Sequence, residues 1–345
     1  MRQLQQLSPR QFLLRESYGN HLKERSGQHE AVLLAEILER NGREDRVSTA
    51  TPPGYCYERE DALPSFAVDA GGPIMQVAAH PGDGPDFFYA TYLKMATHTP
   101  YRANYHEVLL TDGEGGVDGW HPERTRQVRI EEAYAGAEII GSRLHFLGYP
   151  DGSLSALEDR ERTRLVARLA QKIGDIQPAM LVVHPPKNDH PDHAYSFLLT
   201  LAALQLNAQE GGRVPTLLMH DVEFGLQQKS LWLPRVIDPF THTYPMHVPG
   251  LIVDISTTHH LAQHALQKHQ TQMYDPVTGQ PKAYADLIDT LARVRGWQFA
   301  PEETTQTPWG QGFSHVVIPG VTNEQNILPF GLSAGSCYRL VKKDG

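Results

Sequence analysis

Two short stretches of the chain carry side chains that bind divalent metals in proteins. They are Ala79-His80-Pro81-Gly82-Asp83 and His190-Pro191-Asp192-His193, and each follows an apolar run that is typical of a buried strand. Imidazole and carboxylate ligands with one coordination position left open are typical of a hydrolytic metal site rather than a structural one. We therefore predict that His80, Asp83 and His193 bind one divalent metal, for which Zn2+ and Fe2+ are the suited ions.

The same residues also have a purely structural interpretation. His80 would end a strand and Asp83 would cap the next helix, because aspartate is a good N-cap residue. Asp192 would satisfy amides at a helix N-terminus. A second His/Asp cluster at a neighbouring strand end favours the metal site over this alternative. His190 would then lie beside the metal, where it stabilises an oxyanion or protonates a leaving amine, with Asp192 orienting its ring.

Apolar runs and helical segments alternate from residue 73 onward, and this alternation positions both stretches. It predicts an α/β fold, a Rossmann-like and mostly parallel sheet with helices on both faces. Such sheets bind ligands at the carboxyl ends of their strands, where the strand order reverses. The two stretches follow the first and fourth strands, which are neighbours across that reversal. We expect strands at 74–79, 106–111, 144–147, 180–184, 216–220, 251–255 and 314–318, and helices at 87–96, 123–140, 157–173, 193–206, 257–273 and 284–296.

The regions outside this pattern are less regular. Residues 1–70 form a predicted helical extension and connector, with helical apolar spacing at 11–22 and 30–38. This extension packs either on the main domain or on a second subunit, which leaves a homo-oligomer open. The predicted α/β domain covers residues 71–320, and residues 321–345 form a C-terminal tail.

Composition excludes several classes of protein. The formal net charge of −9, with no long run of either sign, argues against a nucleic-acid partner. Two cysteines, far apart in the sequence, match neither a zinc ribbon nor a disulfide framework. No apolar run approaches the ~18 residues of a membrane span, and the N-terminus lacks the apolar segment of a signal peptide. We expect a cytoplasmic protein.

The two stretches and several smaller motifs resemble the LmbE-like (PIG-L) metal-dependent N-deacetylases. The resemblance covers about residues 73–315, and the collinear order of the motifs makes it specific. The family implies that zinc is held by His80, Asp83 and His193, that His190 is the acid or oxyanion partner, and that Arg129 contacts the acyl or sugar end of the substrate. An i, i+3 helix pair with Glu132 is the alternative role of Arg129. The smaller motifs are Leu110-Thr111-Asp112-Gly113-Glu114, Arg129-Ile130-Glu131-Glu132-Ala133, Phe146-Leu147-Gly148-Tyr149-Pro150-Asp151-Gly152, Val253-Asp254-Ile255-Ser256 and His269-Gln270-Thr271-Gln272.

The first motif departs from the family pattern His-Pro-Asp-Asp-Glu at two positions. The family's general base is the first aspartate of that pattern, and here that position is Gly82. The family's glutamate is Gly84. Three accounts follow: Asp86, Asp192 or His190 takes over the base; the metal is kept by a protein that no longer deacetylates; or the loop serves different chemistry.

The sequence thus supports two functions. The first is a zinc-dependent hydrolase that removes an N-acyl group, such as acetyl, from an amino sugar or sugar-like small molecule. The second is a metal-retaining pseudoenzyme that binds a sugar or a partner without turnover. Because the inferred ligands and His190 are all present, the hydrolase is favoured.

Overall fold

A computed structural model gives the fold of the chain. It describes residues 55–59, 72–96, 104–186, 190–220, 250–282, 308–316, 320–322 and 337–342, with isolated residues between 288 and 299 and at 318. The predicted helices at 11–22 and 30–38 lie outside the described residues, as does most of the predicted helix at 284–296.

Nine strands form one mixed sheet in the described part of the chain, in the order β1-β9-β7-β8-β6-β5-β2-β3-β4. One half is parallel and runs through β6, β5, β2, β3 and β4. β2 pairs with β5, so the first and fourth strands of the α/β pattern are neighbours where the strand order reverses, as predicted. The bounds of these strands are β2 Ile74–Ala78, β3 Tyr105–Thr111, β4 Arg143–Tyr149, β5 Met180–Val183 and β6 Thr216–His220.

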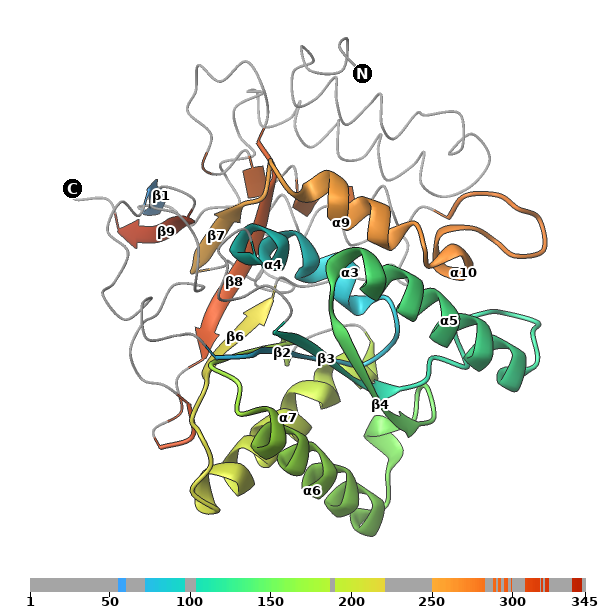
Figure 1. Cartoon of the computed structure of the whole chain (residues 1–345), viewed down its shortest axis with the longest axis horizontal. Helices are drawn as coiled ribbons and strands as arrows, with labels where there is room; N and C mark the ends of the chain where they lie inside the picture. The colour runs from blue at the N-terminus through green and yellow to red at the C-terminus, as the bar shows by residue number, and fades with distance from the viewer. Residues whose placement is uncertain are drawn as a thin grey trace.

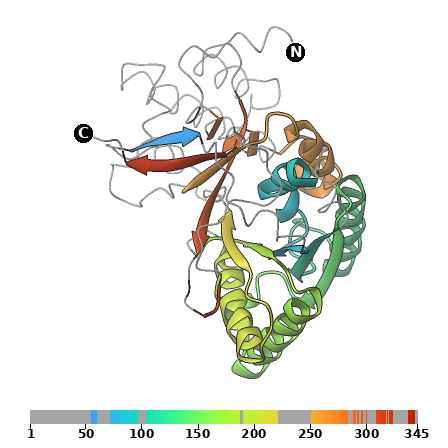
Figure 2. The same cartoon turned by 60° about the vertical axis from the view of Figure 1, so that its left-hand side comes forward.

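The other half of the sheet is antiparallel and includes two strands that periodicity did not predict. β8 (Gly310–Val316) pairs with β6 and β7 (Leu251–Asp254). β9 (Cys337–Lys342) then joins β7 to β1 (Tyr55–Arg59), and Figure 2 shows β1 and β9 side by side at the far end of the sheet. The sheet therefore takes in strands from both segments that flank the predicted α/β domain.

The helices follow the predicted alternation, with two differences. The predicted helix at 87–96 is α4, and a short helix that was not predicted, α3, precedes it; Phe88 separates the two with the non-helical angles φ −141° and ψ −26°. The predicted helix at 257–273 is divided into α9 and α10, with His269 at φ −82° and ψ 62° before the second. The bounds are α3 Asp83–Phe87, α4 Tyr89–Ala96, α5 Pro122–Ile140, α6 Asp159–Ile176, α7 Pro191–Gln209, α9 His259–Leu266 and α10 Gln270–Met273, with a 3₁₀ turn at Leu154–Ala156.

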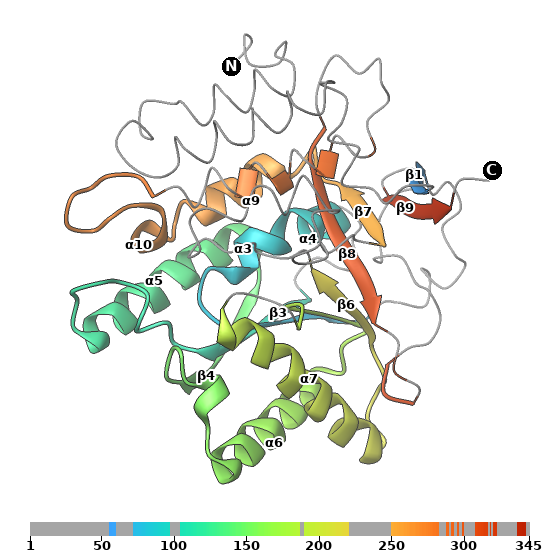
Figure 3. The same cartoon turned by 180° about the vertical axis from the view of Figure 1, so that it is seen from behind.

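Helices cover both faces of the sheet, as predicted for a doubly wound fold. α6 and α7 lie side by side on one face, and α3, α4, α5 and α9 lie on the other (Figures 1 and 3). Alternate residues of β2 enter the two cores: Ile74 packs in the cluster with α4 and α9, and Met75 packs in the cluster with α6 and α7. This burial explains why β2 and β5, and β3 from Val108 to Leu110, are mostly apolar. Among the described residues, no helix has both the length and the apolar character that crossing a membrane requires.

Candidate metal centre

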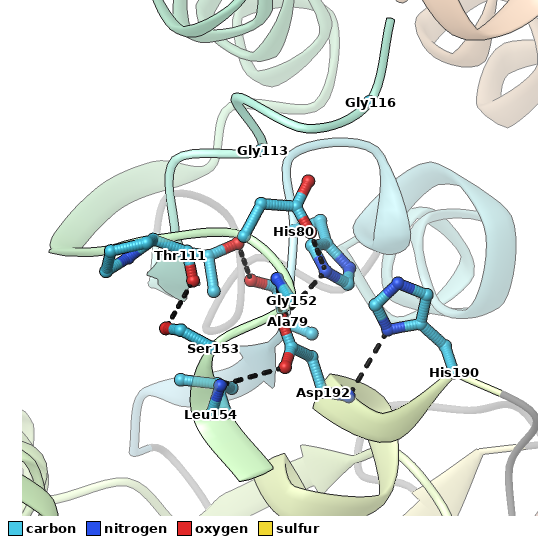
Figure 4. Close-up of polar contacts among 12 residues, drawn as sticks. Ala79, His80, Thr111, Gly113, Gly116, Gly152, Ser153, Leu154, His190 and Asp192 are labelled. Atoms are coloured by element: carbon cyan, nitrogen blue, oxygen red, sulfur yellow. Dashed lines mark hydrogen bonds and ion pairs between the residues drawn. The ribbon is translucent and has the colours of Figure 1, made fainter. Parts of the chain in front are cut away.

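The loop after β2 is folded around the carboxylate of Asp83. Asp83 Oδ2 accepts a hydrogen bond from the backbone N–H of His80 at 2.7 Å. Gly82 precedes α3 with φ 112°, a conformation that favours glycine. α3 begins at Asp83, and its N-cap residue, Gly82, offers no side-chain cap. Thr111 at the end of β3 holds the loop through its N–H and its hydroxyl, which both donate to the carbonyl of Ala79 (Figure 4).

The three predicted ligands lie close together. His80 Nδ1 lies 3.1 Å from His193 Nε2 and 3.7 Å from Asp83 Oδ2, and His193 Nε2 lies 3.6 Å from Asp83 Oδ1. Ligand atoms bound tetrahedrally at 2.0–2.2 Å from one ion are about 3.3–3.6 Å apart. All three side chains are buried. The donor set and its spacing therefore fit a divalent zinc or iron ion.

The second nitrogen of His80 faces two carboxylates. His80 Nε2 lies 3.1 Å from Asp151 Oδ1 and 3.3 Å from Asp192 Oδ2. Burial lowers the pKa of His80, but these two carboxylates outweigh burial and raise it. Histidine ligands of metals typically donate their other N–H to a carboxylate, which fixes the tautomer. This arrangement leaves Nδ1 of His80 as the atom that is free to bind a metal.

The carboxylate of Asp192, which we predicted to orient the ring of His190, contacts other groups. It accepts from the N–H groups of Gly152 at 2.7 Å and Leu154 at 3.0 Å, and it contacts His80 (Figure 4). The backbone N–H of Asp192 donates to His190 Nδ1 at 3.2 Å instead. His190 is the N-cap residue of α7, and this bond puts the proton of its neutral ring on Nε2.

The ring of His190 stands close to the ligands. Its centroid lies 4.5 Å from that of His80 and 5.0 Å from that of His193. Burial and the neighbouring His80 and His193 lower the pKa of His190, so the ring is neutral near pH 7. A neutral ring with its proton on Nε2 can donate a hydrogen bond beside the metal position.

His184 was not predicted as a site residue, although it follows β5 as His80 follows β2. Its Nε2 lies 3.0 Å from Asp83 Oδ2, and its ring stacks on His193 with centroids 4.0 Å apart. His220 Nε2 lies 3.0 Å from His184 Nδ1. Burial lowers the pKa of His184 to about 4, so the ring is neutral. His184 therefore contacts the same oxygen of Asp83 that accepts the N–H of His80.

Arg129 of α5 joins three loops that end at the site. Its guanidinium donates to the carbonyls of Gly113 at 2.9 Å and Pro81 at 2.5 Å, and it lies 3.6 Å from Asp151 Oδ2. Glu132, the alternative helix partner, accepts bonds from the N–H of Thr271 at 2.7 Å and from its hydroxyl at 2.6 Å. Arg129 thus links the segments after β2, β3 and β4.

Asp86, the first candidate replacement for the base, faces another part of the molecule. It is buried and lines a pocket with Phe87, with residues of α9 such as His259, and with the start of β8. Three groups of side chains among the described residues could hold a metal: His80 with His190 and His193, Asp83 with His184 and His193, and His80 with Asp151 and Asp192. None of these groups includes Asp86, and the predicted ligands His80, Asp83 and His193 are spread over more than one of them.

His269, like His184, was not predicted as a site residue. A Cβ atom built at Gly82 would have only His269 within 4 Å among the described side chains, with Nδ1 at 3.6 Å. The ring is 1% exposed, and neither of its nitrogens has a hydrogen-bond partner among the described residues. Burial, together with the charge of Arg129, lowers the pKa of His269 to about 3. His269 is therefore a neutral imidazole facing the position where the family motif carries its base.

The buried neutral ring of His269 has a consequence for stability. Between pH 6.5 and about 3 the unfolded chain takes up a proton at His269 that the folded chain does not. The free energy of unfolding of the wild type should therefore fall relative to that of His269→Gln as the pH falls through this window. Denaturant unfolding of both proteins at about pH 7 and about pH 5 measures the difference. A difference that is the same at both values would contradict a neutral buried ring.

Comparison with known proteins places this site in a family. Residues 75–204 match the sequence model of the family described as GlcNAc-PI de-N-acetylase (PIG-L). A search of curated proteins found no match.

Solved structures with the same fold come from proteins of different function. N,N'-diacetylchitobiose deacetylase from Pyrococcus horikoshii is 18% identical with a TM-score of 0.53, and the match covers 76% of this chain and 91% of that one. The 4-carboxy-2-hydroxymuconate hydratase from Pseudomonas putida is 20% identical with a TM-score of 0.53, covering 74% and 99%. A conserved protein from Thermus thermophilus is 19% identical with a TM-score of 0.52, covering 71% and 97%.

The family match spans β2 to α7 and so contains both predicted stretches, and the shared fold agrees with it. Residues 75–204 of this chain therefore form a domain of the PIG-L (LmbE-like) family.

Proposed function

We propose that the protein is a metal-dependent hydrolase that removes an N-acyl group, such as acetyl, from an amino sugar or a sugar-like small molecule. The observation that carries the proposal is that His80 Nδ1, the carboxylate of Asp83 and His193 Nε2 lie close together. The other nitrogen of His80 contacts the carboxylates of Asp151 and Asp192. The PIG-L match supports N-deacetylation, and the P. horikoshii enzyme of the same fold is a deacetylase. Zn2+ is the preferred ion and Fe2+ the alternative.

A divalent ion held there would polarise the acyl carbonyl and lower the pKa of water. The protein supplies the remaining interactions. His190 donates from Nε2, either to the oxygen that becomes negative or to the leaving amine. Asp192 fixes the loop at Gly152–Leu154 and the ring of His80. Arg129 holds the loops in place rather than being free for the substrate, because its guanidinium donates to two backbone carbonyls.

The general base is assigned to His269. Asp192 is unsuited because its carboxylate already accepts from two backbone amides and contacts His80. His190 is unsuited because its Nδ1 accepts a bond from Asp192 and its Nε2 carries the proton. His269 faces the space above Gly82, and neither of its nitrogens has a hydrogen-bond partner among the described residues. Geometry is therefore the ground for this assignment, because a pKa of about 3 makes the ring a weak base near pH 7.

An acetate-release assay tests the function. Protein loaded with Zn2+ is incubated with N-acetylglucosamine, N,N'-diacetylchitobiose and N-acetylglucosaminyl glycosides, and both acetate and free amine are measured. We expect release that is lost on chelation and restored by metal. Metal-loaded protein that binds these sugars and releases no amine would favour the pseudoenzyme.

The pseudoenzyme is the second candidate because Gly82 has no side chain to act as a base. It predicts that Gly82→Asp gains activity. We expect the opposite, because a residue other than glycine at φ 112° is strained by about 1–3 kcal/mol. Gly82→Asp should lower the melting temperature and the metal content without raising turnover.

Gly82→Ala is the matched control, because it carries the same backbone strain without the carboxylate. Thermal unfolding and acetate release are measured for both variants. A Gly82→Asp protein as stable as wild type, with activity that wild type and Gly82→Ala lack, would contradict the assignment of His269 and favour the pseudoenzyme.

A further inference from the structure

A glutamate is buried in the core beneath the candidate metal centre. Glu107 lies in the middle of β3, opposite Gln76 of β2, and is 2% exposed. It shares a face of the strand with Tyr105, which packs among the apolar residues under α4 and α9. An ionisable side chain is rarely buried this fully without a partner. Burial raises the pKa of Glu107 to about 7.

The partners of Glu107 lie at the start of α3 and α4. Its carboxylate accepts a bond from the hydroxyl of Tyr89 at 2.7 Å and another from the backbone N–H of Gly84. Gly84 is the second residue of α3, directly after Asp83. The first amides of a helix need acceptors from outside the helix. Because Gly82 supplies no side-chain cap, the acceptor for Gly84 comes from β3.

The carboxylate of Glu107 occupies the space that a side chain at position 84 would need. A Cβ atom at Gly84 would lie 2.6 Å from Glu107 Oε1 and 2.8 Å from Oε2, and 2.5 Å from Tyr89 Cε1. Real Cβ atoms do not approach other atoms so closely. A side chain at position 84 and the carboxylate of Glu107 therefore cannot both fit. The carboxylate can reach this space from β3 because residue 84 is glycine.

We propose that Glu107 is a positioning residue for Asp83. Its carboxylate, which reaches the loop from β3, replaces a carboxylate side chain at position 84. By binding the N–H of Gly84 it holds the first turn of α3, and with it the orientation of the Asp83 carboxylate toward His80 and His193. This inference rests on the metal site proposed above.

The first test compares zinc affinity in three full-length proteins. Zn2+ is titrated in competition with a chromophoric chelator into wild type, Glu107→Ala and the control Asn207→Ala. Loss of a residue that orients a ligand typically weakens metal binding about 10–100-fold, and we expect this for Glu107→Ala. Asn207 is also buried and bonds a backbone carbonyl, that of Arg213, but it lies near the opposite end of α7 from His193. Asn207→Ala should lower the melting temperature and leave zinc affinity unchanged.

The second test moves the carboxylate from β3 to the loop. Gly84→Glu alone should destabilise the protein, because the new side chain meets Glu107 and Tyr89. The double variant Gly84→Glu, Glu107→Ala frees the volume on β3 and lets Tyr89 shift into it. We expect it to melt higher than Gly84→Glu and to bind zinc more tightly than Glu107→Ala.

Two results would overturn the proposal: folded Glu107→Ala that binds zinc as wild type does, or a double variant that is no better than the single ones in either measurement. A wild type that takes up no zinc would overturn the metal site itself. The melting temperatures would still show whether positions 84 and 107 are coupled, so the two failures are distinguishable.

Discussion

Asp83→Ala should leave the protein folded and unable to retain metal. Asp83 contributes the carboxylate that His80 and His193 face, and its removal leaves two of the three proposed ligands. Burial acts to raise the pKa of Asp83, but His193 and His184 beside it hold the pKa well below its usual range, so the ligand is charged near pH 7. Elemental analysis of protein purified without chelator or affinity tag should give about one zinc or iron per chain in the wild type and almost none in the variant. Activity should fall with the metal.

Asp159→Ala is the matched control for this experiment. Asp159 begins α6, and its side chain is 99% exposed, so its removal changes the net charge equally without touching the site. It should keep the metal content of the wild type. His193→Ala should behave as Asp83→Ala does. Full metal content in both site variants would contradict the ligand assignment.

His269→Ala should lower the turnover number about 10²-fold, the lower end of the usual contribution of a general base, because the lowered pKa of His269 makes it a weak base. The variant removes the unpartnered imidazole that faces the space above Gly82, and it leaves the three ligands in place. Metal content should therefore be unchanged. The measurement is steady-state release of acetate from a substrate found in the panel, with kcat and KM determined separately.

His106→Gln serves as the control for the loss of a buried histidine. His106 lies on β3, with its ring stacked on that of His145 on β4 and Nδ1 2.9 Å from His145 Nε2. Its replacement should leave kcat unchanged. If His269→Ala turns over as fast as the wild type at equal metal content, another group is the base.

The sequence was sufficient to predict that the two metal-binding stretches meet. Each stretch follows an apolar run too short for a helix, and alternation with helices implies parallel strands whose carboxyl ends share one edge. β2 and β5 are neighbours in the sheet, and that pairing brings His80 and His193 within 3.1 Å. Residue type and strand order together were enough for this part of the site.

Other parts of the site depend on contacts that spacing does not encode. His184 and His269 come from separate elements, and only tertiary packing turns them toward Asp83 and Gly82. The Asp192 carboxylate accepts from the N–H of Gly152, a residue far from it in the sequence, while the backbone N–H of Asp192 is the group that bonds His190. The sequence offered a partial signal for two of these residues: His184 is a polar residue at the end of a buried strand, and His269 opens one of the motifs that resemble the family.

The sheet was predicted less completely at its antiparallel end. β1 and β9 are short strands far apart in the chain, and their pairing gives no periodic signal in either segment. The break between α3 and α4 was missed for a related reason. Phe88 is apolar and fits the helical pattern, but its backbone leaves the helix so that Asp83 and Tyr89 begin separate helices.

The most direct measurement of the central claim is anomalous diffraction at the zinc edge from crystals of the wild type grown with Zn2+. The account predicts a peak bonded to His80 Nδ1, a carboxylate oxygen of Asp83 and His193 Nε2, each at about 2.0–2.2 Å. A peak at Asp83, His184 and His193 without His80, or no peak near these side chains, would contradict it.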